Sequence, residues 1–300
     1  MTSGDAGSRG GRLFVVATPI GNLGDVTLRA IEVLRDVPLV AAEDTRLTRR
    51  LFARHEIATR LISYHAKSGA AREAELLEHL RRGDDLAVVT DAGTPVVSDP
   101  GEGLVAAWGG EGGVVVPIPG ASAVLAAVAA SGVAGPRWTF EGFLPRSGRE
   151  RRERLTRIAA DERGAVVFEA PGRVGGTLRD LAAACPEGRR GAVCRELTKL
   201  HETITRGSLG ELAAAVVNGG IRERGEFVLV VGFAGTDSGG AGGGNDGAAE
   251  EARLENARRQ VEELVRDGVA RGDAARRVSA TTAIPRRQLY GSIRREAGSE

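Results

Sequence analysis

The sequence predicts an α/β protein with two α/β lobes and a small helical appendage at its C-terminal end. Short β-branched runs alternate with helical patterns over residues 12–235, which indicates a sheet of mostly parallel strands in each lobe. A glycine-rich stretch then separates this region from a segment with only helical patterns. The length of 300 residues is enough to bury a substantial core in each lobe.

The first predicted lobe covers residues 12–118. LFVVAT is expected to form the first strand and DVTLRAIEVLRD the helix after it, because its apolar residues recur on one face. Further strands are predicted in PLVAAE, RLISYH, DLAVVTD and GVVVPI, with helices near 45–55 and 70–82.

The second predicted lobe, residues 119–235, begins at the Pro119-Gly120 turn. An alanine-rich helix follows this turn, and further helices are predicted near 148–160, 173–184 and 208–217. The expected strands are RWTFEGF, GAVVFEA, GAVCREL, HETITRG and EFVLVVGFA, of which the last two allow some antiparallel pairing.

Beyond residue 235 the sequence predicts a flexible linker over 236–247, because it consists of glycine and small polar residues. Residues 248–300 then form the predicted helical tail domain. Its first helix is expected over 248–267, and two shorter helices are broken near Pro285.

Composition excludes several classes of protein. The net charge of +1 gives no general attraction to a polyanion, and Lys67 and Lys199 are the only lysines among 41 basic residues. Cys185 and Cys194 lack metal-ligand or disulfide spacing, so we expect no metal and a cytoplasmic location. The uncharged run 112–136 is interrupted by prolines and glycine, which argues against a membrane span.

The stretch TDAGTPVVSDPG, residues 90–101, follows a buried strand and contains unusual backbone chemistry for a simple connection. Its place at the carboxyl end of a parallel strand, with Gly93 and Pro95 in the turn, predicts a ligand-binding loop. Ser98 or Asp99 is expected to cap a helix that begins at Pro100. That cap explains the second part of the loop but not Asp91-Ala-Gly-Thr-Pro.

Two further strand ends carry similar turns, ATPIGNLGDVT and PIPGASA. Neither a GxGxxG fingerprint nor a GxxxxGK[ST] phosphate loop is present, so a simple dinucleotide-binding or P-loop enzyme is not expected. Three proline- and glycine-broken strand ends in one half favour a single binding site at one edge of the sheet.

These motifs, together with AAEDTRLTRRLF, GFLPR, GEFVLVV and the IPRRQLY tail, occur in an order that resembles the tetrapyrrole-methylase-like superfamily. The resemblance covers residues 12–235 and implies two α/β lobes of the tetrapyrrole methylase type, with S-adenosyl-L-methionine in the cleft between them. It is strongest to the branch that methylates the ribose 2′-hydroxyl of a cytidine in the decoding region of 16S rRNA. It also implies a homodimer and the small ribosomal subunit as partner.

The resemblance places cofactor contacts on the turns described above. In this sequence they are Pro19, Ile20, Gly93, Thr94, Val97, Ser122, Ala123 and, in RELTKL, Leu197. The chain departs from the superfamily in one place, because AGTP stands where a GGDP-like loop is common. Thr94 therefore replaces an acidic residue.

A ribose hydroxyl is a poor nucleophile, so a general base is needed near the cofactor. Candidate catalytic residues are Glu43, Asp44 and Arg46 in AAEDTR and His65 in SYHAKS, all at predicted strand ends. The alternative is that Asp44 only caps the following helix and His65 only ends a strand. Glu169, in FEAPGR, is a further polar residue at a strand end.

Two arginine clusters are candidate RNA-binding surfaces. The residues concerned are Arg146, Arg149, Arg151 and Arg152 after GFLP, and Arg286 and Arg287 in the tail. Both clusters also have the simpler interpretation of a solvated helix face in an arginine-rich chain, and the tail could be a dimerisation element. Two other functions remain open at this point: a small-molecule, tetrapyrrole-type methylase, and a non-catalytic RNA-binding assembly protein.

Overall fold

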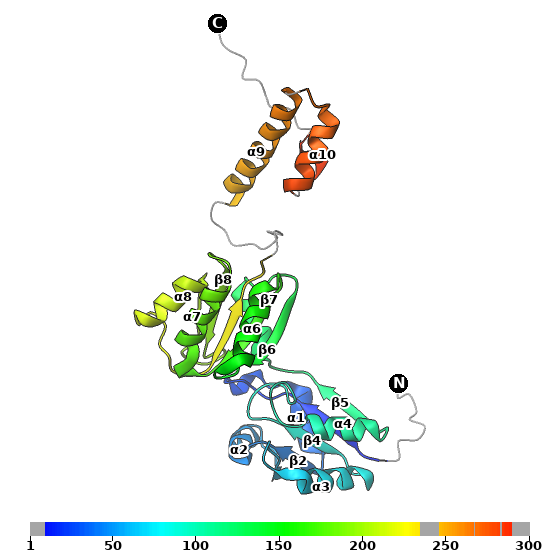
Figure 1. Ribbon diagram of the computed structural model, residues 1–300. Helices are drawn as coiled ribbons and strands as arrows, with labels where there is room; N and C mark the ends of the chain where they lie inside the picture. The colour runs from blue at the N-terminus through cyan, green and yellow to red at the C-terminus, as the bar shows by residue number, and fades with distance from the viewer. Residues whose placement is uncertain (1–9, 235–245, 267, 283, 290–300) are drawn as a thin grey trace. The chain divides into compact units, whose positions relative to one another are not determined.

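The computed structural model describes residues 10–234, 246–266, 268–282 and 284–289. The chain divides into two compact units, Met1–Gly240 and Ala241–Glu300. The first unit contains two five-stranded sheets, one in each lobe (Figure 1). The mixed α/β class predicted from the sequence is therefore confirmed.

The sheet of the first lobe is parallel throughout, in the strand order β3-β2-β4-β1-β5. Its central strands β2 and β4 are buried along their whole length, as expected for a sheet covered on both faces. The strands are β1 (Arg12–Val16), β2 (Leu39–Ala42), β3 (Arg60–Ser63), β4 (Leu86–Val89) and β5 (Val114–Ile118).

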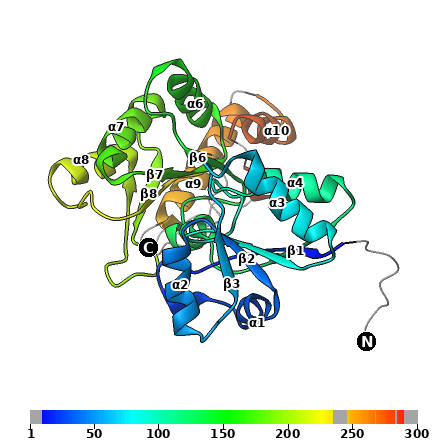
Figure 2. The same cartoon turned by 90° about the horizontal axis from the view of Figure 1, so that it is seen from below.

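Four helices cover this sheet, two on each face (Figure 2). They are α1 (Leu28–Asp36) and α2 (Thr45–Arg54) on one face, and α3 (Gly69–Arg81) and α4 (Glu102–Gly110) on the other. A short 3-10 helix, η1 (Leu23–Asp25), precedes α1. Side-chain caps fix two of the helix starts: Thr27 accepts a hydrogen bond from the Ala30 N–H, and Asp44 accepts one from the Arg46 N–H.

The second sheet has the order β6-β7-β10-β8-β9 and is mostly antiparallel. Only β6 and β7 run parallel, so the expectation of mostly parallel strands is wrong for this lobe. The reason is that β8 and β9 follow each other without a crossover helix and therefore pair antiparallel. β10 lies between β7 and β8 and runs antiparallel to both strands. The strands are β6 (Trp138–Phe143), β7 (Gly164–Glu169), β8 (Arg190–Arg195), β9 (Thr203–Ser208) and β10 (Phe227–Val231).

The helices of the second lobe cover its sheet unequally. Three of them, α6 (Gly148–Ala160), α7 (Val174–Ala184) and α8 (Leu209–Val217), pack on one face, with η2 (Pro171–Arg173) before α7. The other face is covered by α5 (Ala123–Ser131), which the PIPGASA turn introduces. Ile20 of the first lobe joins the core between α5 and this sheet, so the two lobes share apolar packing.

The C-terminal unit consists of α9 (Asp246–Arg266), α10 (Arg271–Thr282) and α11 (Arg286–Leu289). Its small core is built from alanine, valine and leucine side chains. Most of the predicted linker, residues 236–245, lies outside the described residues, and α9 already begins at Asp246. In the part of the chain that the structure describes, no helix combines the length and apolar character needed to cross a membrane.

Packing on the sheet, not helix propensity, holds α1 in place, and two leucines of this helix allow a test. Leu34 is completely buried, whereas Leu28 is 79% exposed. We expect Leu34→Ala to lower the free energy of unfolding by about 2–5 kcal/mol, because it leaves a cavity. Leu28→Ala should change it by no more than about 0.5 kcal/mol. Urea denaturation of both variants measures the difference, and equal losses would contradict this packing.

Candidate active site

A pocket of about 470 Å³ lies where loops from the two sheets meet. The carboxyl ends of β2, β4 and β5 form one side of it, and the ends of β6, β7 and β8 with the start of β10 form the other. Its volume is within the range of small-molecule binding sites. The pocket therefore lies where parallel sheets generally bind ligands.

The loop after β4 is fixed to the end of β1 by a two-way backbone pairing. The Thr18 N–H donates to the Gly93 carbonyl (2.8 Å) and the Gly93 N–H donates to the Thr18 carbonyl (3.0 Å). Gly93 has a φ of +82°, which favours glycine. A Cβ there would lie 3.4 Å from Ile20 Cγ2 and 3.8 Å from the Ala121 carbonyl oxygen. Glycine thus keeps this part of the pocket open.

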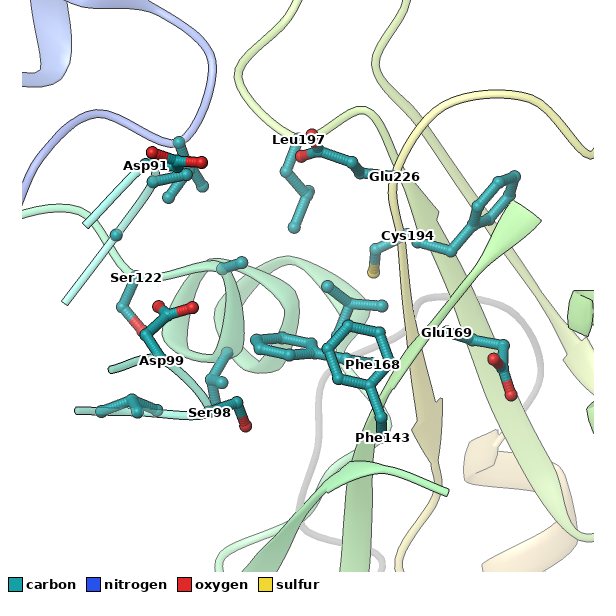
Figure 3. Close-up of a pocket in the computed structure, with 18 of the residues that line it drawn as sticks. Asp91, Ser98, Asp99, Ser122, Phe143, Phe168, Glu169, Cys194, Leu197 and Glu226 are labelled. Atoms are coloured by element: carbon teal, nitrogen blue, oxygen red, sulfur yellow. The ribbon is translucent and has the colours of Figure 1, made fainter. Parts of the chain in front are cut away.

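The remainder of the same loop is strained. Val96 (φ 75°) and Ser98 (φ 66°) both occupy the left-handed region, which is unusual above all for a β-branched residue. The helix after them begins at Glu102, and its N-cap is Gly101, without a side-chain cap. The predicted cap by Ser98 or Asp99 is therefore wrong, because the left-handed turn delays the helix by two residues. Asp99 instead lines the pocket (Figure 3).

Three carboxylates, Glu43, Asp91 and Asp99, gather at one end of the pocket. The Asp91 N–H donates to Glu43 Oε2 (3.3 Å), and the Asp44 N–H donates to Asp91 Oδ1 (2.9 Å), so these two loops hold each other. Burial raises the pKa of all three carboxyl groups. Repulsion within the group adds to this effect for Glu43 and Asp99, whereas for Asp91 the added repulsion comes from Asp44.

The effect is largest for Asp99. Burial, followed by the nearby charges of Glu43 and Asp91, raises the pKa of Asp99 to about 6, although the Thr90 hydroxyl acts in the opposite direction. Figure 3 shows its carboxylate directed toward the interior of the pocket. A carboxylate with a pKa close to neutrality is suited to accept a proton from a bound substrate.

The opposite wall includes a second strained turn, Glu196–Thr198. Glu196 (φ 51°) and Thr198 (φ 67°) flank Leu197, which lines the pocket. Glu196 accepts hydrogen bonds from Lys199 Nζ (3.0 Å) and from the Glu226 N–H (2.8 Å). The Asn22 N–H donates to Thr198 Oγ1 (3.2 Å), which connects this turn to the first lobe. Non-glycine residues with positive φ on both walls indicate a preorganised site.

Aromatic rings form the part of the pocket opposite Asp99 (Figure 3). Phe168 packs edge-to-face with Phe143 at 5.6 Å and with Phe140 at 4.9 Å between ring centroids. Phe143 nevertheless remains 54% exposed, which leaves it free to contact a ligand. Burial raises the pKa of the neighbouring Cys194 to about 11, so this thiol stays neutral and is no nucleophile.

Two arginines, the buried Arg151 and the partly buried Arg173, hold the loop that follows Phe143. Arg173 Nη2 donates to the Leu144 carbonyl (2.7 Å), and Arg151 Nη1 donates to the Pro145 carbonyl (3.0 Å). Arg173 Nε also pairs with Glu169 (3.1 Å), whose carboxylate is fully buried and accepts a hydrogen bond from Thr177 Oγ1 (2.6 Å). Glu169 therefore contributes to the rim of the pocket as a structural residue, with its carboxylate directed away from the rings (Figure 3).

Seven of the eight expected cofactor contacts line this one pocket: Ile20, Gly93, Thr94, Val97, Ser122, Ala123 and Leu197. Pro19 is not among the lining residues. Ser122 also caps α5 by accepting a hydrogen bond from the Leu125 N–H, and Thr94 Oγ1 donates to the Ala121 carbonyl at 3.4 Å. Thr94, where this sequence has AGTP in place of a GGDP-like loop, therefore places a hydroxyl between the turn after β4 and the turn after β5.

The structure separates the candidate catalytic residues. Glu43 lines the pocket, whereas Asp44, Arg46 and His65 do not. Asp44 caps α2 and pairs with Arg46 (2.6 Å), which lowers its pKa to about 2. His65 Nδ1 accepts a hydrogen bond from the Lys67 N–H (3.1 Å) in a local turn. The cap interpretation thus describes Asp44 better than the catalytic one.

The candidate RNA-binding arginines also differ in their surroundings. Arg146, Arg149 and Arg152 are exposed at the start of α6, and Arg286 and Arg287 are exposed on α11. Arg151 is buried and bound to Asp180 (2.7 Å) as well as to the Pro145 carbonyl. It lies on the buried face of α6, which it shares with Leu155 and Ile158. It is therefore a positioning residue and is not available to a nucleic acid.

Sequence reasoning missed Asp99 and both phenylalanines as pocket residues. Gly101 could have revealed Asp99, because a glycine two residues later is an alternative N-cap and leaves Asp99 outside the helix start. For Phe143 it was the GFLP segment, which places an aromatic residue at a strand end beside a proline turn. Among the described residues, no group of three or more His, Cys, Asp or Glu side chains is arranged to hold a metal ion.

Comparison with known proteins places this geometry in a family. Residues 12–213 match the family described as Tetrapyrrole (Corrin/Porphyrin) Methylases. Among solved structures, a cobalt precorrin-4 methyltransferase of cobalamin biosynthesis is 19% identical, with a TM-score of 0.57 over 73% of this chain and 94% of that one. The uroporphyrin-III C-methyltransferase of Thermus thermophilus, solved with S-adenosyl homocysteine, is 20% identical, with a TM-score of 0.52 over 74% and 97%.

The fold and the cleft thus define a methyltransferase of the tetrapyrrole methylase class. A curated relative from Synechocystis sp., named ribosomal RNA small subunit methyltransferase I, is 44% identical over 93% of this chain and 96% of its own length. The chain belongs to this ribosomal RNA small subunit methyltransferase I family.

The cofactor of the chain is S-adenosyl-L-methionine, and the pocket suits it. Small residues of the loops after β4 and β5 leave backbone accessible to a ligand, and the phenylalanines offer faces for a flat ring. The carboxylates at the other end favour the positive charges of a sulfonium and an ammonium group. These features are independent of one another and all fit the same molecule.

We expect Gly93→Leu to lower the affinity for S-adenosylhomocysteine by about tenfold or more, because the side chain would fill the pocket beside Ile20. Isothermal titration calorimetry measures this loss. Gly83→Leu is the matched control, since Gly83 also has a positive φ (+95°) but a Cβ there would meet nothing within 4 Å. It should reduce stability without changing affinity. Unchanged affinity in Gly93→Leu would remove this loop from the cofactor site.

Proposed function

We propose that the chain methylates the ribose 2′-hydroxyl of a cytidine in the decoding region of 16S rRNA, in the small ribosomal subunit. The names of the curated relatives support the class of RNA. We further propose that it acts as a cytoplasmic homodimer. The observation that carries the reaction type is Asp99, a half-buried carboxylate with a raised pKa inside the cofactor pocket.

A ribose hydroxyl must lose its proton as it attacks a methyl group, and the residues of the pocket can serve this step. S-adenosylmethionine, when bound, supplies a methyl group activated by a sulfonium. Asp99 is the proposed general base, which takes the 2′-hydroxyl proton on its carboxylate. Glu43 and Asp91 keep the local potential negative and thereby maintain the basicity of Asp99. A positioned base of this kind contributes about 10²–10⁴-fold to the rate.

The proposed cofactor contacts are the seven pocket residues named above and, from the resemblance, Pro19 at the start of the first loop. Leu197 and the phenylalanines come from the second lobe, so a bound ligand would touch both lobes. Binding would then reduce the freedom of one lobe against the other. This arrangement favours an in-line placement of the acceptor hydroxyl, which supplies part of the rate enhancement through orientation.

Exposed arginines next to the pocket support RNA as the substrate. Arg146 lies in the loop between Phe143 and α6, Arg152 lies on α6, and Arg149 pairs with Glu153 one turn away (2.6 Å). Such surface pairs are weak and exchange readily with phosphate. Arg286 and Arg287 on α11 are the proposed RNA contacts of the C-terminal unit. Arg151 is left out of this surface because it is buried.

Methyl transfer to RNA tests the proposal as a whole. We expect labelled methyl from S-adenosylmethionine to appear on unmethylated small ribosomal subunits, and nuclease mapping to locate it on the 2′-oxygen of one cytidine. Free 16S rRNA is the comparison substrate, because assembled subunits display the decoding region in its folded form. Label on a base nitrogen or carbon, or transfer only to small tetrapyrroles, would contradict the proposal.

Asp99→Asn should reduce the turnover number at saturating cofactor by about 10²–10⁴-fold, because the amide cannot accept the proton. In the unsubstituted protein, activity should rise with pH through about 6 and then level off, since only the ionised carboxylate acts as a base. The pH-rate profile under single-turnover conditions measures both effects. The activity of Asp99→Asn should show no such increase with pH.

Asp44→Asn is the matched control, since an amide preserves the helix cap and Asp44 lies outside the pocket. Its activity should stay near that of the parent protein.

Stability provides an independent check of folding. The raised pKa of Asp99 means that the folded state loses stability as the pH rises from 3.8 to about 6, so Asp99→Asn should unfold no more easily than the parent at neutral pH. Full activity of Asp99→Asn would exclude it as the base.

A further inference from the structure

A second hollow, of about 880 Å³, lies in the second lobe and is not part of the cofactor pocket. It is formed at the end of β8, at the start of β9 and by the segment between α8 and β10. Its polar lining includes Arg195, His201, Thr203, Thr205, Arg222 and Arg224. Arginine guanidinium groups and hydroxyls are the side-chain donors that proteins use to bind phosphate.

The hollow and the cofactor pocket are neighbours on opposite faces of one sheet. Cys194 lines the pocket, and Arg195, the next residue of β8, lines the hollow, as alternation along a strand requires. The alternation ends with the strand: Glu196, which has a positive φ, also lines the hollow, and Leu197 lines the pocket. Gly225 lines both. The shared Gly225 makes the pocket and the hollow neighbours at this end of the sheet.

One arginine shapes the hollow and two are left for a ligand. Arg195 Nε donates to the Arg224 carbonyl (2.6 Å) and its Nη1 to the His201 carbonyl (3.4 Å), so Arg195 connects two walls. Arg222 and Arg224 are exposed, and within the described ranges neither forms an ion pair with a carboxylate.

The acidic residues of the hollow are already engaged. Glu196 accepts a hydrogen bond from Lys199 Nζ (3.0 Å), and Glu202 accepts one from the Thr198 N–H (2.6 Å). Among the described residues, neither carboxylate forms an ion pair with Arg222 or Arg224. The hollow thus presents two exposed positive charges next to hydroxyl groups, beside a pocket whose own ionisable lining is acidic.

We propose that this hollow binds a backbone phosphate of the RNA strand next to the methylated nucleotide. The proposal rests on the function proposed above, because it requires RNA as the substrate. Arg222 and Arg224 contact the phosphate, and the Thr203 and Thr205 hydroxyls are further donors. Phosphate contacts fix the position of a strand without reading its sequence, so the hollow would set which nucleotide enters the pocket. The exposed Leu200 side chain at the same hollow offers an apolar contact for an unstacked base.

The test uses the full-length double variant Arg222→Ala/Arg224→Ala. Its affinity for unmethylated small subunits and for a short single-stranded RNA is measured over a series of salt concentrations. We expect affinity about tenfold lower at low salt, and a salt-dependence slope smaller by about 0.7 for each phosphate that the variant no longer neutralises. The affinity for S-adenosylhomocysteine should not change. Arg222→Lys/Arg224→Lys should restore most of the slope, because the charge is retained.

The matched control is Arg179→Ala/Arg190→Ala, which removes two exposed arginines from the same lobe. Arg190 lies at the opposite end of β8 from Arg195. An equal decrease in affinity in this control would reduce the effect to general charge and overturn the proposed site. An unchanged salt-dependence slope in the Arg222→Ala/Arg224→Ala variant would also overturn the proposed site.

Two further outcomes separate the hollow from the proposed function. If the parent protein methylates rRNA and the double variant binds RNA equally well, the hollow is not an RNA site while the function stands. If the parent protein neither binds nor methylates rRNA, both proposals fail. Inorganic phosphate at matched ionic strength is a competitor for the parent protein. If the double variant loses phosphate binding but keeps its RNA slope, a free phosphate ligand replaces the RNA strand as the occupant.

Discussion

The backbone pairing between Thr18 and Gly93 is the constraint on which the site depends. It ties the loop after β4 to the end of β1, and only a residue that tolerates positive φ can make it without strain. The loop must then pass through two left-handed residues before α4 can begin at Glu102. Asp99 lies in this delayed connection. The same geometry that opens space beside Ile20 therefore also brings a carboxylate into the pocket.

Charge is distributed unevenly around the second sheet and the loops that meet it. The cofactor pocket collects carboxylates, whose mutual repulsion and burial would be unfavourable without a cation to balance them. A sulfonium cofactor provides that balance. The hollow on the other face presents exposed arginines instead. In the proposed function, this distribution attracts a substrate strand with a negative backbone beside the pocket, while the proposed base within the pocket serves the reacting hydroxyl.

Arginine serves two purposes that its abundance in this chain conceals. Arg151, Arg173 and Arg189 are directed inward and donate to backbone carbonyls that close loops of the second lobe. Their planar guanidinium groups can satisfy several acceptors at once, which a lysine cannot do with the same geometry. Other arginines of α6, Arg149 and Arg152, remain on the surface. Only the packing around each position distinguishes a structural arginine from one that can contact RNA.

The sequence by itself determined the α/β class, nearly every strand and helix, and the three turns that meet at the pocket. Hydrophobic periodicity and glycine and proline positions are local properties, and they specify local structure well. Tertiary structure decided the antiparallel pairing of the second sheet, the burial of Arg151 and the difference between Asp44 and Asp99. Both aspartates follow strands and precede helices. Asp44 caps its helix beside an arginine and stays strongly acidic, whereas Asp99 is half-buried near Asp91 of its own loop and Glu43 from a distant part of the chain. Burial and charge at a site are sums over residues far apart in sequence, and for that reason the fold had to be known before the base could be proposed.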